Sequence, residues 1–349
     1  MAIQSVIVKN FRNYESYAVE FRPGVTIIVG PNASGKTNLL ESVYMLAQGS
    51  SFRASDKDLI ARGSEWLRLD GVFDGSERTL KLKLGQPKTQ KSFSIDDSTY
   101  GRLSFGLTIP TVLFEPDDIR LIGGSPERRR VFLNDLLNQS VPTYKKSLSS
   151  YNRALKQRNT LLKKHADSSS LFAWNVIMAR SAEEIVQARQ KAVAEINDQI
   201  SAIYGSIADK VHHISMEYQT QIVSENYMNA LVHRLERSLD TDRVRGFTSV
   251  GPHRDDLLIT IDGTPASISA SRGEARTITL ALKIIEVAMI QAVRGQSPIL
   301  LLDDVFSELD GVRRKMLTSF LSDHQAIITT TDADVVGKKF TQLAEFISL

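Results

Sequence analysis

Short apolar stretches rich in β-branched residues recur in the first third of the chain and predict strands. Residues 2–8 and 25–29 are two of them. After the second stretch and the segment 30–36, apolar side chains recur three or four positions apart in residues 37–48, as in a helix. Residues 67–105 contain short alternating stretches separated by Gly and Asp, which predicts an antiparallel meander, and a further strand precedes Pro116. The pattern predicts an α/β unit combined with antiparallel strands.

The middle of the chain has a helical pattern instead. Residues 127–165 are mostly helical in character, with a break expected near Pro142 because proline disrupts a helix interior. Residues 171–204 form a second long helical segment that contains neither Pro nor Gly. The short polar loop between these segments predicts an antiparallel helical hairpin or a small bundle. The lack of a sustained heptad repeat argues against a long coiled coil.

Strand patterns return in the last third of the chain. Residues 211–219 and 246–263 read as strands, residues 273–293 as an amphipathic helix, and "ILLLD" and "AIITT" as two buried strands. We therefore predict one α/β head that is interrupted by an inserted helical arm. The expected domains are the N-terminal part of the head, the arm, and the C-terminal part of the head, over residues 1–120, 121–240 and 241–349.

Composition narrows the class of protein. Of 349 residues, 42% are hydrophobic and 24% are charged, values typical of a folded globular protein. No run of ~18 apolar residues is present, so we expect no membrane span, and the N-terminus lacks the apolar core of a signal peptide. The absence of cysteine excludes disulfides and cysteine-based metal sites. We therefore expect a cytoplasmic protein without a membrane partner.

The segment between the second strand and the following helix carries the strongest chemical signal. It fits the pattern G-x-x-x-x-G-K-[ST], in which backbone N–H groups curl around a phosphate, the lysine reaches the β- and γ-phosphates, and the hydroxyl binds Mg²⁺. Its position between a strand and a helix is the one that this chemistry requires. We therefore expect ATP to bind at Gly30, Pro31, Asn32, Ala33, Ser34, Gly35, Lys36, Thr37 and Asn38.

A second signal lies at the end of the buried strand "ILLLD". Asp303 and Asp304 emerge at the carboxyl end of this strand, where ligands of α/β proteins bind. We expect Thr37 and Asp303 to hold Mg²⁺, Asp304 to orient or activate the attacking water, and Lys36 to act on the phosphates during catalysis. Lys36 and Asp303 are 267 positions apart, so the inserted arm must leave the head and return to it between the two motifs.

A third element precedes the amphipathic helix of residues 273–293. Ser271 is placed to cap this helix, and Gly273 follows closely. A helix N-terminus with free N–H groups and a nearby hydroxyl can also bind an anion. Ser271 is therefore a candidate for a catalytic phosphate contact as well as a cap, with Gly273 beside it.

Seven ordered segments make the chain similar to the RecF family of bacterial recombination-mediator ATPases, which are relatives of SMC and ABC ATPases. The segments are NFRNY (10–14), GPNASGKTNLLE (30–41), SFR (51–53), PDDIRLIGGSPERRRVFLN (116–134), GPHRDD (251–256), SRGEAR (271–276) and LLLDDVFSELD (300–310). The resemblance covers essentially the full length. It implies an ABC/SMC-like P-loop ATPase head, with a mixed sheet plus an antiparallel meander, and an inserted helical arm that faces DNA.

The resemblance also implies a cycle in which ATP binding closes two heads into a homodimer and hydrolysis releases them. Ser271 of one copy would complete the site that contains Lys36 of the other. Arg12 and Asn13 would lie over the nucleotide, and residues 307–310 would cross the same interface. The implied role is in DNA replication, repair of gaps and stalled forks, and SOS induction, by helping to load RecA with RecO and RecR as partners. The implied activity is a weak DNA-dependent ATPase.

The chain departs from the family pattern at several positions. Asn134 stands where the family usually has Asp, and Arg272 and Glu274 stand where glutamines are more frequent. Glu115 lies near the expected glutamine loop, and the switch histidine of transport ATPases is missing. Because Asp304 stands where transport ATPases usually have Glu, a nucleotide-gated scaffold that scarcely hydrolyses ATP is an alternative. The ATPase subunit of a membrane transporter is another, which the motif spacing and the basic arm disfavour.

Positive charge is concentrated in the predicted arm. Residues 127–165 contain ten Lys or Arg and two acidic residues, a net charge of +8 against +3 for the whole chain. Such an asymmetry creates a local positive potential at which DNA phosphates bind, in single-stranded, gapped or double-stranded form. The DNA-contact candidates are Arg128, Arg129, Arg130, Lys145, Lys146, Arg153 and Lys156.

The segment GPHRDD has two open interpretations. Its Gly-Pro start predicts a turn, and Arg254 could pair with Asp255 or Asp256, which favours a structural role. His253 is also more readily structural than a metal ligand, because no second ligand falls at a suitable spacing. A contact to nucleotide or DNA is the alternative.

Overall fold

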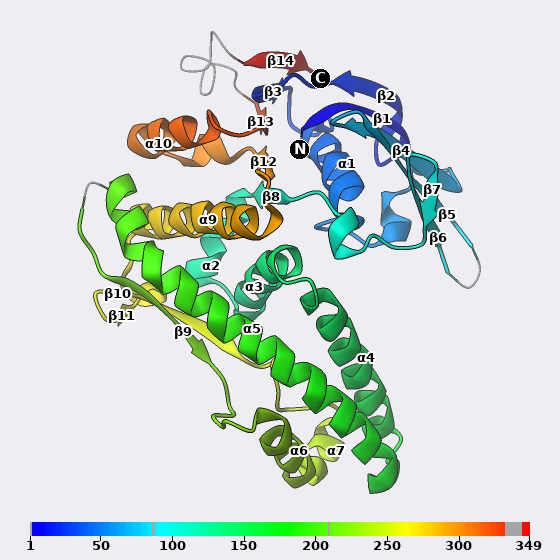
Figure 1. The fold of residues 1–349 in the computed structure, drawn as a ribbon, viewed down its shortest axis with the longest axis vertical. Coiled ribbons are helices and arrows are strands. Elements are labelled where there is room, and N and C mark those ends of the chain that lie inside the picture. Colours follow the sequence, from blue (N-terminus) through cyan, green and yellow to red (C-terminus); the bar gives the residue numbers. More distant parts are fainter. Residues whose placement is uncertain (1, 86–87, 209, 332–343) are drawn as a thin grey trace. The chain divides into compact units, whose positions relative to one another are not determined.

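The chain folds into two compact units (Figure 1). The first unit consists of Met1–Asp118 and Glu286–Leu349, and the second of Ile119–Ile285. The second unit is thus inserted into the first, and the predicted α/β head with a helical insertion is confirmed. The structure is a computed structural model and describes residues 2–85, 88–208, 210–331 and 344–349.

Six antiparallel strands form one sheet of the first unit, in the order β2-β1-β4-β5-β6-β7. They are β1 (Ile3–Phe11), β2 (Tyr14–Glu20), β4 (Trp66–Phe73), β5 (Ser76–Lys83), β6 (Gln90–Ile95) and β7 (Ser98–Tyr100). Buried and less buried residues alternate along β4 and β5, so one face of the sheet packs on the core. The predicted meander is confirmed, whereas β2 was not predicted.

Five parallel strands form the other sheet of this unit, in the order β14-β3-β13-β12-β8. They are β3 (Val25–Val29), β8 (Thr111–Phe114), β12 (Ile299–Asp303), β13 (Ala326–Thr330) and β14 (Glu345–Ser348). The three central strands are buried almost throughout, as expected for parallel strands covered on both faces. Because the strands are parallel, the loop after β3 and the acidic end of β12 lie at the same edge.

Helix α1 (Lys36–Gln48) packs between the two sheets of the first unit. It contacts β12 and β13 of the parallel sheet and β1, β4 and β5 of the antiparallel sheet. Ten of its 13 residues are buried, so the helix is held from both sides and its first turn has a fixed position. The first unit also contains α10 (Gly311–Leu321) and the short 3₁₀ helices η1 (Asp56–Leu59), η2 (Phe105–Leu107) and η4 (Val305–Glu308). A further 3₁₀ helix, η3 (Pro116–Ile119), lies at the boundary with the second unit.

Helices dominate the second unit. Helix α3 (Pro126–Ser140) ends just before Pro142 and α4 (Tyr144–Lys163) begins just after it, which confirms the predicted break. Helix α4 packs along α5 (Ser168–Ala208), a helix of 41 residues, as the predicted hairpin (Figure 1). The shorter helices are α2 (Arg120–Gly123), α6 (Tyr227–Arg237), α7 (Leu239–Arg245) and α8 (Ala266–Ser269).

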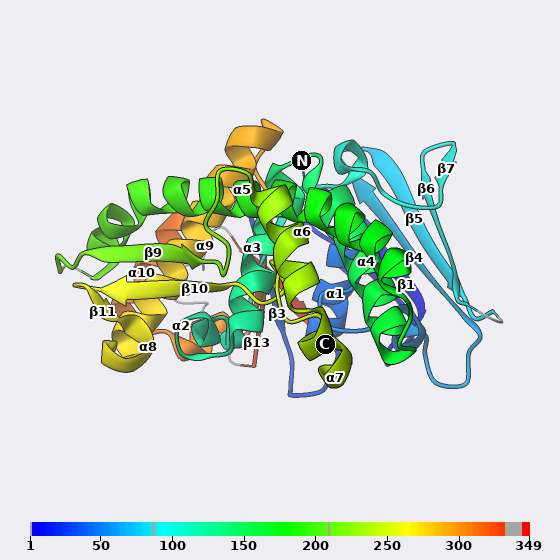
Figure 2. The same ribbon diagram turned by 90° about the horizontal axis from the view of Figure 1, so that it is seen from below.

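A small antiparallel sheet lies against α5 (Figure 2). Its order is β11-β10-β9, with β9 (Ile214–Gln219), β10 (Asp256–Ile261) and β11 (Thr264–Pro265). The Asn197 amide of α5 both donates to and accepts from the backbone of Met216, at 2.8 and 2.7 Å, and so pairs the free edge of β9. Because β10 pairs with β9, residues 241–285 fold with the second unit, and the expected division near residue 240 lies inside it.

Two parts of the second unit differ from the prediction. Residues 246–255 are a loop rather than a strand, because Gly246 and Gly251 adopt positive φ angles of 73° and 122° that a strand does not contain. Helices α6 and α7 were not predicted. The buried residues of α6, Tyr227, Leu231 and Leu235, recur every four positions, and this spacing is the signal that could have revealed it.

Candidate functional site

The loop between β3 and α1 is held in a defined conformation. The Gly30 N–H donates to the Thr330 carbonyl of β13 at 3.3 Å. Gly35 has a φ of 111°, and a Cβ at this position would lie only 2.6 Å from the Tyr14 hydroxyl oxygen. Ala33, which is exposed, also has a positive φ of 66°. The positive φ therefore favours glycine at position 35, and the nearby Tyr14 side chain adds a steric reason.

Lys36 begins α1, and its ammonium group lies against the loop. Nζ donates to the carbonyls of Gly30 at 2.7 Å and Pro31 at 2.9 Å, and only 8% of the residue is exposed. An ammonium has three donors, so one remains for a phosphate oxygen. The Ser34 hydroxyl is buried and has no hydrogen-bond partner among the described residues, while Pro31 and Asn32 are exposed. The Lys36 ammonium and the Ser34 hydroxyl are therefore donors that fit a phosphate chain.

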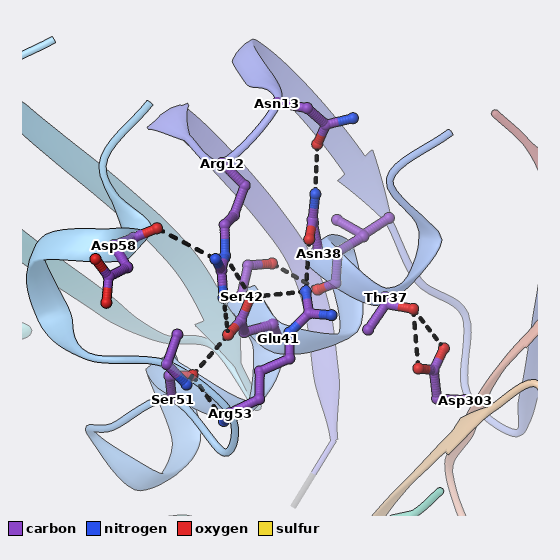
Figure 3. A network of polar contacts seen from close by, with 12 residues as sticks. Arg12, Asn13, Thr37, Asn38, Glu41, Ser42, Ser51, Arg53, Asp58 and Asp303 are labelled. Carbon is purple, nitrogen blue, oxygen red and sulfur yellow. Dashed lines mark hydrogen bonds and ion pairs between the residues drawn. The ribbon is translucent and has the colours of Figure 1, made fainter. Parts of the chain in front are cut away.

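Thr37 and Asp303 bring the two sequence motifs together. The Thr37 hydroxyl lies 2.8 Å from each oxygen of the Asp303 carboxylate (Figure 3). The Thr329 hydroxyl of β13 donates to the same carboxylate at 2.7 Å, a contact that the sequence did not reveal. Mg²⁺ prefers oxygen ligands and usually takes few from protein, with phosphates and water supplying the rest. The hydroxyl of Thr37 and the carboxylate of Asp303 therefore fit this metal.

Asp304 follows β12 in a left-handed backbone conformation, with a φ of 50°. Its N–H donates to both the carbonyl and the hydroxyl of Thr329, each at 3.1 Å, which fixes the turn. Its Oδ1 atom is buried and has no hydrogen-bond partner among the described residues. Burial raises the pKa of this carboxyl, the Lys36 cation opposes the shift, and the Asp303 charge adds to it. A carboxylate with an unused acceptor and a raised pKa is suited to orienting water.

Arg12 and Asn13 form the turn between β1 and β2. The Arg12 guanidinium donates from Nε and Nη2 to the two carboxylate oxygens of Glu41, both at 2.9 Å. Glu41 is fully buried and also accepts hydrogen bonds from Arg53 at 3.0 Å and from Ser51 at 2.6 Å (Figure 3). Burial disfavours the charge of Glu41, yet the hydrogen bonds from both arginines and the serine hold its pKa below the ordinary value.

Two asparagines connect this cluster to the phosphate-binding loop of residues 30–37, the P-loop. The Asn38 amide donates to the Asn13 side-chain oxygen at 2.6 Å, and Asn13 donates to the Ser34 carbonyl at 3.4 Å. Arg53 donates to the Asn38 side-chain oxygen at 2.5 Å. The sequence suggested Arg12, Asn13 and Asn38 but assigned no role to Glu41 or Arg53. A signal was present in the sequence: Glu41 falls among the apolar residues on the buried side of α1, and a buried acidic residue requires a partner.

Ser271 and Gly273 lie at the start of α9 (Arg272–Arg294), in the second unit, whereas the P-loop and both aspartates lie in the first. The Ser271 hydroxyl accepts from the Glu274 N–H at 3.2 Å, and the Glu274 carboxylate accepts from the Ser271 N–H at 2.8 Å. This reciprocal pair is a capping box, so the predicted capping role of Ser271 is confirmed. The same bonds hold the pKa of Glu274 below its ordinary value.

The DNA-contact candidates fall into two groups. Arg129 donates from Nε and Nη2 to the Asp256 carboxylate at 2.7 and 2.8 Å, and Arg130 donates to the Asp255 carbonyl at 2.8 Å. Both therefore act inside the second unit, and Arg128 beside them is half-buried. The candidates on α4 are exposed, namely Lys145, Lys146, Arg153 and Lys156.

Arg158 is one of the ten basic residues counted in the arm, but it is not available to a partner. Its side chain is fully buried and pairs with the equally buried carboxylate of Asp242 at 2.8 Å. The exposed positive surface is therefore smaller than the sequence predicted. Helix α4 contains no acidic residue, so its exposed face presents basic and neutral side chains only.

The segment GPHRDD joins α4 to β10 through buried contacts. His253 bonds the Tyr151 hydroxyl through Nδ1 at 2.5 Å and faces the Thr248 carbonyl through Nε2 at 3.1 Å. Burial lowers the pKa of His253 to about 4, so the ring is neutral at pH 7. The suggested pairing of Arg254 with a neighbouring aspartate is wrong, because Arg254 lies over the Phe247 ring at 4.9 Å and donates to the Thr248 carbonyl. These contacts favour the structural interpretation.

In the part of the chain that the structure describes, no group of three or more His, Cys, Asp and Glu side chains could hold a metal ion. None of the helices within the described ranges is long and apolar enough to cross a membrane.

Comparisons with known proteins agree with this geometry. A family model described as RecF/RecN/SMC N terminal domain matches residues 2–346. The chain is 33% identical to the DNA replication and repair protein RecF of Natranaerobius thermophilus, and the match covers 96% of this chain and 92% of the relative.

Solved structures give the same result. A structure of the recombination mediator protein RecF-ATPrS in the RecFOR pathway has a TM-score of 0.86 at 31% identity, over 96% of this chain and 94% of that one. An Smc head bound to the C-terminal winged-helix domain of ScpA has a TM-score of 0.51 at 17% identity, over 96% and 91% of the two chains, which shows the fold alone.

Proposed function

Since the chain belongs to the RecF/RecN/SMC family, as one of its RecF members, we propose that it is an ATP-dependent, DNA-binding recombination mediator. It acts in the cytoplasm in DNA replication and in the repair of gaps and stalled forks. ATP binding drives dimerisation on DNA, and hydrolysis to ADP and phosphate releases the complex. With RecO and RecR as partners it helps to load RecA and so supports SOS induction. The similarity to RecF-ATPrS in the RecFOR pathway supports this proposal.

The nucleotide is held by the loop from Gly30 to Thr37. Two of the three ammonium hydrogens of Lys36 bond to loop carbonyls, and the third contacts the phosphates. The N–H groups of the loop add further donors. The unpartnered hydroxyl of Ser34 gains an acceptor when a phosphate is present. A buried polar group without a partner costs about 1–3 kcal/mol, so phosphate binding removes this penalty.

Thr37 and Asp303 hold Mg²⁺, which neutralises phosphate charge when it is bound. In the described geometry the two side chains are already in contact, so little rearrangement is needed to present both oxygens. Thr329 orients the Asp303 carboxylate from the neighbouring strand. Asp304 accepts a hydrogen bond from the attacking water through Oδ1 and aligns it with the γ-phosphate.

A second copy of the chain completes the site. Ser271 and Gly273 at the start of α9 contact the γ-phosphate held by the P-loop of the partner copy, and residues 307–310 cross the same interface. The helix start presents N–H groups and a hydroxyl, the groups that recognise phosphate. The chain is thus active as an ATP-dependent homodimer.

DNA binds along α4 rather than at the arginine triplet of α3. The exposed basic residues of α4 extend over a helix of 20 residues, about 30 Å long, which matches roughly one turn of duplex. Arg129 and Arg130 instead act within the second unit, where they fix the start of β10 to α3.

The observation that carries the proposal is the contact between Thr37 and Asp303, which joins two motifs 266 positions apart around one prospective metal site. Sedimentation velocity with and without ATP and DNA tests it. The wild type is expected to form dimers only with ATP, more of them with DNA, and Lys36→Arg is expected to hydrolyse ATP more slowly. A chain that stays monomeric with ATP, or unchanged hydrolysis by Lys36→Arg, contradicts the proposal.

The residue type at position 304 favours a second candidate, a nucleotide-gated scaffold with negligible hydrolysis. Aspartate reaches less far than glutamate, the residue that transport ATPases usually have at this position, so Asp304 is less able to contact an attacking water. Measuring ATP turnover of the wild type against Asp304→Asn separates the two functions. Equal, near-zero turnover identifies the scaffold.

A further inference from the structure

Glu41 is a fully buried carboxylate that the proposed ATP cycle does not use. It accepts two hydrogen bonds from Arg12, one from Arg53 and one from Ser51. Replacing a buried ion pair by apolar side chains of similar size often leaves stability unchanged or improved, so packing alone does not explain a charged residue here. The two guanidinium groups outnumber the one carboxylate, which leaves the cluster with one excess positive charge.

Both arginines depend on Glu41 for their orientation. The two parallel bonds from Arg12 fix the plane of its guanidinium, and Arg12 also donates to the Asp58 carbonyl at 3.2 Å. Ser51 donates to Glu41 and accepts from the backbone N–H of Arg53 at 3.0 Å, which ties the Arg53 loop to the same carboxylate. One side chain of α1 therefore sets the position of two cations from different segments (Figure 3).

The cluster is bonded to the P-loop through a continuous chain. Arg53 contacts Asn38, Asn38 contacts Asn13, and Asn13 contacts the Ser34 carbonyl. Asn38 directly follows Thr37, the proposed metal ligand. The side chains of Arg12 and Arg53 remain 22% and 36% exposed, so their charge is accessible to a ligand beside the first turn of α1.

We propose that Glu41 is a positioning residue that holds Arg12 and Arg53 as a pair of cations for the phosphate chain of the bound nucleotide. This inference rests on the proposed ATP binding. Glu41 acts through the two arginines and does not contact the nucleotide itself. The Glu41 carboxylate aligns both guanidinium groups. Its single negative charge neutralises only one of the two positive charges, so one positive charge remains for a phosphate.

A double-mutant cycle with a fluorescent ATP analogue tests this assignment on the full chain. The single variants Glu41→Gln and Arg53→Gln are each expected to weaken binding of the analogue at least ~10-fold. The fold-loss of affinity in the double variant is expected to be clearly smaller than the product of the two single fold-losses. Displacement of the analogue by inorganic tripolyphosphate is expected to weaken in parallel, because the cations recognise phosphates rather than the base. A purely structural role would leave this displacement unchanged in folded protein.

The matched control is Arg68→Gln, which removes a paired, 43% exposed arginine from the same unit on β4 and is expected to bind like the wild type. If Glu41→Gln does not fold, Arg53→Gln and Ser51→Ala, which keep the Arg12–Glu41 pair, are measured instead. Binding by the folded variants within about twofold of the wild type overturns this inference and leaves the proposed function intact. A wild type that binds no ATP overturns the proposed function itself.

Discussion

The buried ion pair between Arg158 and Asp242 allows a quantitative test of what holds the second unit together. Arg158 comes from α4 and Asp242 from α7, and both side chains are 0% exposed. Asp242→Ala removes the carboxylate and leaves a guanidinium buried without its countercharge. Such a change usually costs about 3–5 kcal/mol, because the remaining charge has neither water nor a partner.

The remaining contacts of Arg158 place the expected loss in the lower part of this range. Its guanidinium keeps hydrogen bonds to the Thr248 hydroxyl at 2.7 Å, the Asn175 side chain at 2.8 Å and the Leu235 carbonyl at 3.2 Å. We expect a loss of about 3–4 kcal/mol in the free energy of unfolding. For a unit of this size, each kcal/mol lowers Tm by ~2–4 °C, so the expected fall is about 6–16 °C.

Thermal unfolding followed by circular dichroism at pH 7 measures this fall. The control is Asp240→Ala, which removes a fully exposed carboxylate from the same helix and is expected to leave Tm unchanged. The double variant Arg158→Met with Asp242→Ala removes both charges and is expected to recover part of the loss. If Asp242→Ala melts within about 2 °C of the wild type, the reasoning about the unpaired charge is refuted.

Three further predictions concern the proposed cycle. Ser271→Arg is expected to leave ATP binding by one chain intact but to abolish ATP-dependent dimers in sedimentation, and normal dimers would show that the contact in trans is wrong. Asp304→Asn is expected to lower the hydrolysis rate at least ~10²-fold with ATP affinity retained, as measured by phosphate release. Glu substitutions on α4 are expected to weaken DNA binding. The slope of log K against log[salt] is expected to become shallower by up to ~0.9 for each DNA phosphate that the variant no longer neutralises. An unchanged slope would place the DNA site elsewhere. The residues to be changed together are Lys145, Lys146, Arg153 and Lys156.

The features that the sequence predicted well are those encoded locally. The P-loop is a contiguous pattern between a strand and a helix, and the aspartates end a continuous apolar strand. Parallel pairing then requires the two segments to share an edge, so the Thr37–Asp303 contact followed from topology. The break at Pro142 was equally local.

The features that the sequence did not reveal depend on partners that are distant along the chain. A run of three arginines has the same appearance whether it faces solvent or not, and Arg129 is bound by Asp256, 127 positions away. Arg158 has its partner Asp242 84 positions away. The Glu41 cluster likewise needs the turn at Arg12 and the loop at Arg53 to converge on α1. Charge counts along a sequence therefore overestimate the surface that a ligand can reach.

The parallel pairing of β12 with β8 and β13 has a consequence for biosynthesis. The P-loop is translated 267 residues before Asp303, and the entire second unit is made in the interval. At a typical ~5–20 residues per second, the ribosome needs about 13–53 s to cover this distance. Throughout that time the nascent P-loop lacks the strand that carries its acidic partner, so the helical insert has the opportunity to fold first. The ability to hold a metal-bound triphosphate is therefore acquired late in synthesis, when β12 with Asp303 joins the sheet.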